Sequence, residues 1–173
     1  MFVIAQILGG IAILILLGYT IMKVNRGTIL ACTIAINLLW ALHYLLLKAY
    51  TGCVCSLICV GTVAVFFFKG KIKLLSGIWV PIFFGIIYLL FGILTWENKF
   101  SLLPILCSFL VVIALWNDRE IVIKSIFIVV ALLWVIYNSV FFSYIGMIGQ
   151  GLSFLFNALY VIKYYVLKKR THD

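Results

Sequence analysis

Charged residues are scarce in this 173-residue sequence: they make up 10% of the chain, and only four of them are acidic. A soluble domain is about half apolar, and about a quarter of its residues are charged. Here 67% of the residues are hydrophobic and the mean hydropathy is +1.32. This composition excludes a soluble globular domain and a disordered chain, and it indicates an integral membrane protein.

The acidic residues also lack the positions that proton transport or catalysis needs. All four lie between or after the long apolar segments, at Glu97, Asp118, Glu120 and Asp173. Proton-coupled transporters usually carry an ionisable residue within the membrane. Inside the apolar segments only His43 could serve, and an interhelical hydrogen bond is its more ordinary role. We therefore expect facilitated diffusion rather than proton coupling.

Catalytic motifs are missing as well. The sequence contains no H-E-x-x-H, no G-x-S-x-G and no glycine-rich phosphate-binding loop. Cys53 and Cys55 could join His43 in a soft-metal site, but residues two apart point to different faces of a helix, and no C-x-x-C pair exists. We expect no enzyme, no catalytic residue, no metal site and no cofactor.

Seven long apolar runs are present instead. Each is close to the length that an α-helix needs to cross a bilayer. The runs do not alternate as barrel strands do, and hydrocarbon requires backbone groups to be satisfied within the segment. The predicted helices are 2–22, 28–48, 53–68, 76–96, 101–116, 122–142 and 146–167. Their short connections make sequential helices antiparallel.

Basic residues are distributed unevenly between the two ends of these helices. Eleven of the thirteen Lys and Arg residues fall on the side that receives the chain after the first, third, fifth and seventh helices. Lys48 and Lys99 fall on the other side. The positive-inside rule places the basic side in the cytoplasm, so we predict an outside N-terminus and a cytoplasmic C-terminus. The net charge of +9 then reflects topology, and we expect no nucleic-acid partner.

An internal repeat relates two parts of the sequence. The segment NLLWALHYLLLKAYTG from Asn37 resembles ALLWVIYNSVFFSYIG from Ala131, 94 residues later. The matched pairs include Trp40 with Trp134, Tyr50 with Tyr144, Gly52 with Gly146 and Lys69 with Lys163. We predict an all-α membrane protein of seven helices, in which two parallel three-helix bundles (1–75 and 98–173) are joined by one linker helix (76–97). Transporters with parallel repeats bind their substrate between the two halves.

Four segments carry a resemblance to a known family: QILGGIA near the start, NLLWALHYLLLKAYTG, LLPIL, and LLWVIYNSV. They resemble the YgjV family of bacterial inner membrane proteins, which implies the bacterial inner membrane as location and carries no catalytic residues to transfer. The three-plus-one-plus-three order, the orientation and the parallel repeat are more distantly similar to the SWEET and semiSWEET sugar facilitators and the PnuC-type vitamin transporters.

That second resemblance implies a particular solute site. In those families, a Trp on the second helix of a bundle and an Asn on the third flank the solute. Trp134 and Asn157 look similar, and Trp40 keeps the pattern in the first bundle, whereas Val63 stands at the position that matches Asn157. The Pro-Gln dipeptide of the related PQ-loop proteins is also absent. The two halves therefore depart from the symmetric Trp and Asn pattern of a sugar site.

Polar side chains within the apolar segments mark either a binding site or hydrogen bonds between helices, since they are costly in lipid. An aromatic wall with amide donors and acceptors suits a small neutral polar solute. The predicted substrate-binding residues are Asn37, Trp40, Trp134, Asn138, Gln150 and Asn157. The alternative for these residues is that they only hold helices together.

Two helix-weakening residues stand at matching positions in the repeat. Gly10 and Pro104 are 94 residues apart, in the first helix of each bundle. We predict that they act as hinges about which one bundle rocks against the other. The alternative is that they only permit close helix packing.

These features together favour a SWEET-like facilitative transporter that moves a small neutral polar solute across the inner membrane by alternating access. Its expected partners are the solute and the lipid bilayer, and it is expected to be a monomer or a homodimer. The alternative function is a membrane interaction or assembly protein that transports nothing.

Overall fold

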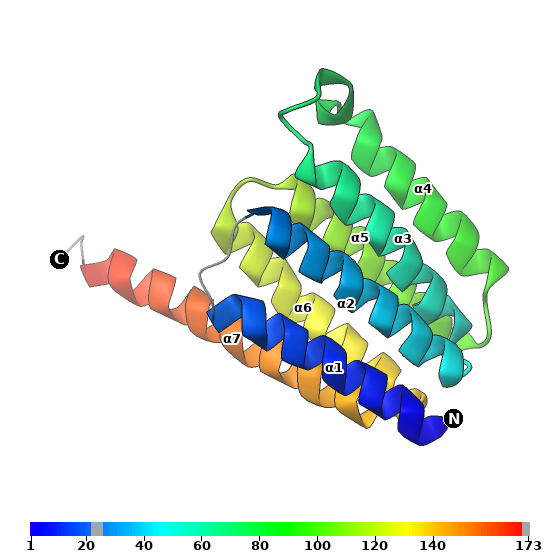
Figure 1. Ribbon diagram of the computed structural model, residues 1–173. Helices are drawn as coiled ribbons and strands as arrows, with labels where there is room; N and C mark the ends of the chain where they lie inside the picture. Colours follow the sequence, from blue (N-terminus) through cyan, green and yellow to red (C-terminus); the bar gives the residue numbers. More distant parts are fainter. Residues whose placement is uncertain (22–25, 171–173) are drawn as a thin grey trace.

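The computed structural model describes residues 1–21 and 26–170, and these residues form helices joined by short connections (Figure 1). The elements are α1 (Phe2–Ile21), α2 (Arg26–Leu46), α3 (Tyr50–Phe67), the 3-10 turn η1 (Lys73–Ser76), α4 (Trp79–Leu94), the 3-10 turn η2 (Lys99–Ser101), α5 (Leu102–Trp116), α6 (Glu120–Val140) and α7 (Tyr144–Arg170). Within these residues, the prediction of an all-helical chain with seven α-helices is confirmed. Lys23 and Asp173, which the orientation and charge arguments used, lie outside the described residues.

The predicted helix bounds are correct to within three residues. One of the largest differences, at the start of the fourth helix, has a local cause. The fourth helix begins at Trp79 rather than at 76 because Gly77 has an extended backbone, with φ −80° and ψ 150°, after the η1 turn. Four segments are long and apolar enough to cross a membrane: Tyr50–Phe67, Lys99–Trp116, Glu120–Val140 and Tyr144–Val166. The apolar parts of α1, α2 and α4 are shorter.

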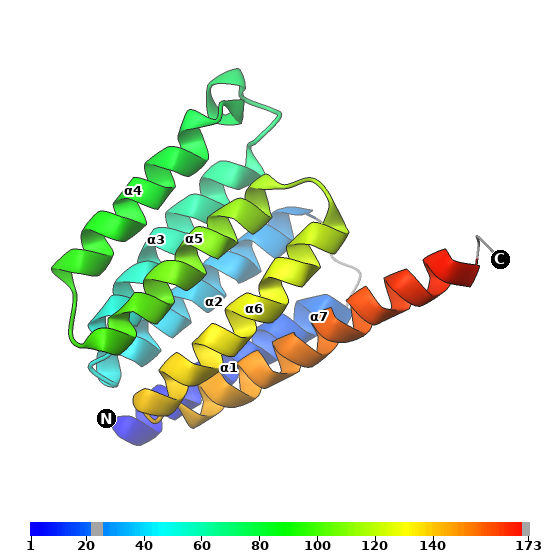
Figure 2. The ribbon, with the colours of Figure 1, turned by 180° about the vertical axis from the view of Figure 1, so that it is seen from behind.

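Helix α2 packs between α1 and α3, and α6 packs between α5 and α7 (Figures 1 and 2). We call α1–α3 the first half and α5–α7 the second half. The halves meet where α3 contacts α5 and where α1 contacts α7, and α4 lies against α3 and α5. One end of the bundle holds the start of α1 and the α2–α3, α4–α5 and α6–α7 connections, and we call it the N-terminal end. The opposite end, with the α3–α4 and α5–α6 connections, is the basic end.

Helix boundaries in the two halves recur at the 94-residue interval of the sequence repeat. Arg26–Leu46 and Glu120–Val140 begin and end 94 residues apart, and so do the starts of α3 at Tyr50 and of α7 at Tyr144. The contacts between the halves recur as well. When α1, α2 and α3 are matched with α5, α6 and α7, the α1–α7 contact corresponds to the α5–α3 contact. The backbone thus repeats at an interval that the sequence comparison found from side chains.

The α2–α3 and α6–α7 turns are also alike in backbone conformation. Lys48 and Phe142 have φ values of 59° and 52°, and they are the non-glycine residues with positive φ in the described chain. Such values are uncommon in residues other than glycine. Each turn is closed by a matching hydrogen bond: Ala49 N donates to Tyr44 O over 2.8 Å, and Ser143 N donates to Asn138 O over 2.9 Å. Both turns therefore reverse the chain in the same way.

Both prolines occupy the third residue of a helix, Pro81 in α4 and Pro104 in α5. The first four N–H groups of a helix have no partner within it, so a proline there removes no helical hydrogen bond. Pro104 thus lies in the first turn of α5 rather than in its interior. Gly10 lies in the middle of α1, and a Cβ added there would meet no other atom within 4 Å. Their hinge role stays a prediction.

Gly52 lets the two halves approach closely at the N-terminal end. A Cβ built on it would lie 2.9 Å from Tyr137 Cε1 and 3.2 Å from Tyr44 Cγ. Both rings are buried, with 0% and 3% of their surfaces exposed. Neither ring can move aside without disturbing its neighbours, so the absence of a side chain at this position is a packing requirement.

We therefore expect Gly52→Ala to lower the free energy of unfolding by about 1–3 kcal/mol through overpacking. Gly151→Ala is the matched control, because that helical position is open, and alanine favours a helix by up to about 1 kcal/mol over glycine. Thermal unfolding of both purified variants measures the difference. Equal melting temperatures for the two variants would contradict this packing role.

Candidate functional site

A cavity of about 290 Å³ lies between the two halves of the bundle. Its wall runs from Thr33 to Tyr44 on α2 and from Phe127 to Trp134 on α6. Residues of α3, α4, α5 and α7 complete the wall. Thr33 and Phe127 are each the eighth residue of their helix counted from the basic end, so the cavity lies in the middle of the bundle.

Four aromatic side chains lie at the other limit of the cavity. The Tyr44 ring stacks between two indoles, 5.8 Å from Trp40 with an interplanar angle of 26° and 5.5 Å from Trp134 with an angle of 17°. The Tyr137 ring stands at 83° to Trp134, with centroids 5.5 Å apart. Such pairs contribute about 0.5–1.5 kcal/mol each beyond their burial. This aromatic layer (Trp40, Tyr44, Trp134 and Tyr137) joins α2 to α6 and closes the cavity toward the N-terminal end.

Four of the six predicted binding residues line this one cavity: Asn37, Trp40, Trp134 and Gln150. The Asn37 Nδ2 donates to Thr33 O over 2.9 Å, which leaves its Oδ1 as an acceptor. The side chain of Gln150 makes no hydrogen bond to another described residue, so its amide is available to a ligand. The structure therefore brings together two indoles and two amides from three helices.

Asn138 and Asn157, the other two predicted residues, do not line the cavity. Asn138 lies behind the aromatic layer, where its Oδ1 accepts a hydrogen bond of 3.0 Å from the Tyr44 hydroxyl. Its Nδ2 is buried and has no partner among the described residues. Asn157 Nδ2 donates to the backbone oxygen of Ser153 over 2.7 Å, one turn earlier in α7. In this structure, the Asn138 amide therefore joins the two halves, and the Asn157 amide bonds to its own helix.

Sequence reasoning missed the contribution of α4 and α5 to the cavity. Tyr88, Cys107 and Ser108 line it, together with Cys55 of α3. The available signal was a polar residue in an otherwise apolar helix, which Ser108 provides. Its hydroxyl donates a hydrogen bond to Pro104 O over 2.8 Å, so its oxygen can still accept a hydrogen bond from another group. The cavity wall thus combines amides, hydroxyls, thiols and aromatic rings.

At the N-terminal end, α1 holds the α6–α7 turn. Gln6 Nε2 donates to Phe142 O over 3.0 Å, and Gln6 Oε1 accepts from Ile145 N over 3.1 Å. One amide side chain therefore satisfies two backbone groups of the turn. These bonds connect the first helix of the first half to the second half.

His43 strengthens the same connection and is completely buried. Its Nδ1 lies 2.6 Å from Ala5 O, and its Nε2 lies 2.7 Å from Ser143 Oγ. Because a carbonyl oxygen only accepts hydrogen bonds, Nδ1 carries a proton, and in the neutral ring Nε2 accepts from the serine hydroxyl. His43 thus links α1, α2 and the start of α7.

The α2–α3 turn is held in a corresponding way by the α4–α5 connection and α6. Thr51 Oγ1 donates to Thr95 O over 2.6 Å and lies 3.1 Å from Ser101 Oγ. The carboxylate of Glu97 accepts a hydrogen bond from the backbone N–H of Tyr50, the first residue of α3. The Tyr137 hydroxyl accepts a further bond, over 3.0 Å, from the N–H of Gly52. Both turns at the N-terminal end are therefore fastened across the halves.

Glu97 is half-buried in the α4–α5 connection, outside the membrane-spanning segments. Burial raises the pKa of its carboxyl above the usual value of 4.5, and the hydrogen bond from the Tyr50 backbone offsets part of that rise. Its Oε2 has no hydrogen-bond partner in the described part of the chain. The ionised form is therefore only partly compensated for its loss of water.

No group of three or more His, Cys, Asp or Glu residues that could hold a metal ion occurs within residues 1–21 and 26–170. All five cysteines are free thiols. Cys55, Cys59 and Cys107 line the central cavity and add small polarisable residues to its wall.

A chain of seven apolar helices, four of them long enough to span a bilayer, is an integral membrane protein. The family model Imp-YgjV, described as a bacterial inner membrane protein, matches residues 3–168. The chain therefore belongs to the YgjV family of bacterial inner membrane proteins, as the sequence resemblance indicated. A search of the curated proteins and a search of the solved structures each gave no match. The relationship to SWEET, semiSWEET and PnuC-type proteins is not shown by these comparisons.

The raised pKa of Glu97 predicts a specific pH dependence of stability. The folded chain holds this proton more tightly than the unfolded chain, so Glu97 lowers stability as the pH rises from about 4.5 through the folded-state pKa. We expect Glu97→Gln, which keeps an acceptor for Tyr50 N–H, to remove this decline. Thermal melts across pH 4–8 measure the effect.

Glu120→Gln is the matched control, because this exposed carboxyl lies at the opposite end of the bundle. It should keep the decline that Glu97 causes. An unchanged pH dependence in Glu97→Gln would show that the carboxyl is not held as described.

Proposed function

We propose that this protein is a facilitative transporter that moves a small neutral polar solute across the inner membrane by alternating access. The observation that carries the proposal is the central cavity. It lies in the middle of the bundle between two halves of matching helix bounds, and the aromatic layer separates it from the N-terminal end. The combination is what an alternating-access mechanism requires in one of its two states.

The first support is the 94-residue interval. The bounds of α2 and α6, the starts of α3 and α7 and the two turns with positive φ all repeat at this interval. We infer from it a three-plus-one-plus-three arrangement, in which two parallel bundles are related about an axis along the membrane normal and α4 is the linker. Transporters of this plan move one half against the other around a central site.

The second support is the chemistry of the cavity wall. Trp40 and Trp134 offer flat apolar surfaces, and Asn37 and Gln150 offer amide donors and acceptors. Rings bind the apolar face of a solute, and a few placed polar groups fix its orientation. These groups recognise an uncharged molecule that has both a flat apolar face and hydrogen-bonding edges. The cavity volume of about 290 Å³ limits the solute to a small molecule.

The third support is the closure at the N-terminal end. The aromatic layer, the Gln6 and His43 bonds to the α6–α7 turn and the Thr51 and Glu97 bonds to the α2–α3 turn all lie there. With the basic end in the cytoplasm, this arrangement corresponds to the state closed to the outside. Opening to the outside then requires the halves to separate at these bonds.

Reporter fusions test the orientation on which this interpretation depends. We expect a fluorescent protein fused after residue 173 to fluoresce, and a periplasmic phosphatase fused at the same place to be inactive, because the basic end faces the cytoplasm. A phosphatase fused within the α2–α3 turn at Lys48 should be active. The reverse pattern would contradict the proposed orientation.

Transport itself is tested with purified protein in liposomes and a panel of radiolabelled neutral solutes, including sugars, nucleosides and vitamins. We expect one class to equilibrate across the membrane without a proton gradient. Trp134→Ala should lower its initial rate by about tenfold or more, because the loss of a large apolar stacking surface costs about 1.5–3 kcal/mol of binding. Binding is checked in parallel by the rise in melting temperature that a bound solute causes.

Trp96→Ala is the matched control, since Trp96 lies in the α4–α5 connection and does not line the cavity. It should transport at the wild-type rate. An absence of uptake and of thermal stabilisation across the whole panel would favour the alternative, a membrane interaction or assembly protein without transport. Equal losses in the two variants would place the effect outside the cavity.

A further inference from the structure

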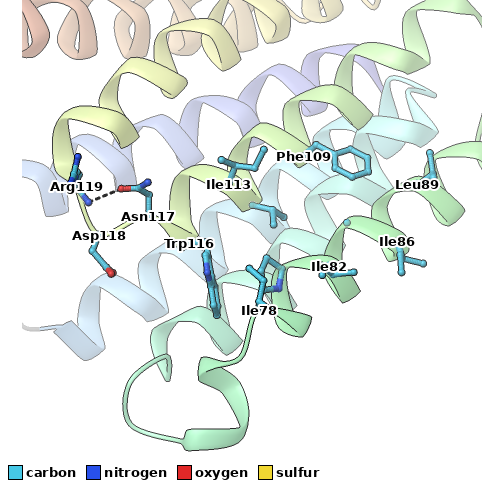
Figure 3. Close-up of a pocket in the computed structure, with 13 residues that line it drawn as sticks. Ile78, Ile82, Ile86, Leu89, Phe109, Ile113, Trp116, Asn117, Asp118 and Arg119 are labelled. Carbon is cyan, nitrogen blue, oxygen red and sulfur yellow. Dashed lines mark hydrogen bonds between the residues drawn. The ribbon is translucent and has the colours of Figure 1, made fainter.

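A second concave surface lies on the outside of the bundle, between α4 and α5 (Figure 3). It is a groove of about 810 Å³, much larger than the central cavity. Its walls are apolar and open to the surroundings: Ile82, Ile86 and Ile113 have 56%, 61% and 54% of their surfaces exposed. In an integral membrane protein, this surface faces hydrocarbon.

The groove is shaped by the way α4 crosses α5. Near the N-terminal end the two helices touch, because a Cβ on Gly92 would lie only 2.4 Å from Ile105 Cγ1. At Gly85 the corresponding distance to Phe109 Cε1 is 3.1 Å. Toward the basic end large side chains, Ile78 and Trp116, line the groove instead. The groove therefore forms an apolar slot that ends at the level of the α5–α6 connection.

Polar residues stand at the mouth of this slot. Asn117, Asp118 and Arg119 follow directly after α5 and border the groove, as Figure 3 shows. Asp118 forms an ion pair of 3.1 Å with Lys69, whose ammonium also donates to Trp116 O. Arg119 is exposed, and within the described residues it has no carboxylate at ion-pair distance. The mouth thus presents one guanidinium without an ion-pair partner among the described residues, beside the ion pair of Lys69 and Asp118.

We propose that the α4–α5 groove binds one anionic phospholipid, with an acyl chain along the isoleucines and the phosphate at Arg119. A phospholipid combines an apolar chain with an anionic group at the depth where the helix ends and the headgroup region begins. A guanidinium matches the oxygens of a phosphate group with paired hydrogen bonds, and basic side chains at the membrane surface favour anionic lipids. The site is separate from the central cavity, so it does not depend on transport.

Retention of lipid by the detergent-purified chain tests this site. Native mass spectrometry would compare dioleoyl phosphatidylglycerol with dioleoyl phosphatidylcholine, which has the same chains and a zwitterionic headgroup. We expect the wild type to retain one phosphatidylglycerol about fivefold better than phosphatidylcholine, the factor that one basic residue provides. Arg119→Gln should bring the ratio close to one. Ile82→Trp, which fills the slot, should reduce retention of both lipids.

Lys71→Gln is the matched control, because it removes one exposed positive charge at the same end but outside the groove. It should keep the wild-type preference. Equal retention of the two lipids by the wild type, or equal losses in Arg119→Gln and Lys71→Gln, would overturn the proposal. So would a protein dimer that excludes lipid and that Ile82→Trp dissociates, since a second copy would then occupy the groove. Circular dichroism melts confirm that each variant is folded.

Discussion

Hydrocarbon offers no hydrogen-bond partner, and the architecture of this protein depends on that constraint. Buried polar groups therefore take their partners inside the bundle, mostly at the N-terminal end, whereas Asn138 Nδ2 has no partner among the described residues. There, the imidazole of His43 is bonded at both nitrogens, and the amide of Gln6 serves two backbone groups of the α6–α7 turn. The bond from His43 to Ala5 stays within the first half, but the bonds of His43 to Ser143 and of Gln6 to the α6–α7 turn cross between the halves. The same constraint that satisfies polar groups therefore also fastens the two halves together.

The aromatic layer separates this polar region from the central cavity. Trp40 and Trp134 each contact Tyr44 and also line the cavity wall, while Tyr44 bonds to Asn138 behind them. The residues that would contact a solute are thus in direct contact with the residues that close the N-terminal end. In the transport proposal, the binding of a solute in the cavity and the closure of the N-terminal end both involve the rings of Trp40 and Trp134. The two events are therefore coupled by direct contact rather than through a long-range network.

Much of the fold could be predicted from the sequence, because lipid leaves a long apolar run only the helix as a stable structure. The prediction missed where α4 begins, since an extended Gly77 after a 3-10 turn leaves no mark in hydropathy. For the cavity, the proposed repeat paired Trp40 with Trp134, and both residues line one cavity. Helical spacing could not tell that the Asn157 amide is bonded to Ser153 of its own helix, or that Asn138 faces Tyr44. The partner of a side-chain amide depends on tertiary packing, which periodicity does not contain.

The hydrogen bond between Tyr44 and Asn138 joins residues that are themselves 94 positions apart. In the proposed repeat, these two residues occupy one equivalent position and meet at the axis that relates the halves. Two separate copies of a shorter chain would have to place the same side chain on both sides of such an axis. A fused chain can assign a phenol to one side and an amide to the other, and the two sites can then evolve independently. Gene fusion would thereby allow a hydrogen-bond donor, Tyr44, and an acceptor, Asn138, to face each other at the axis, where a symmetric dimer must present two identical side chains.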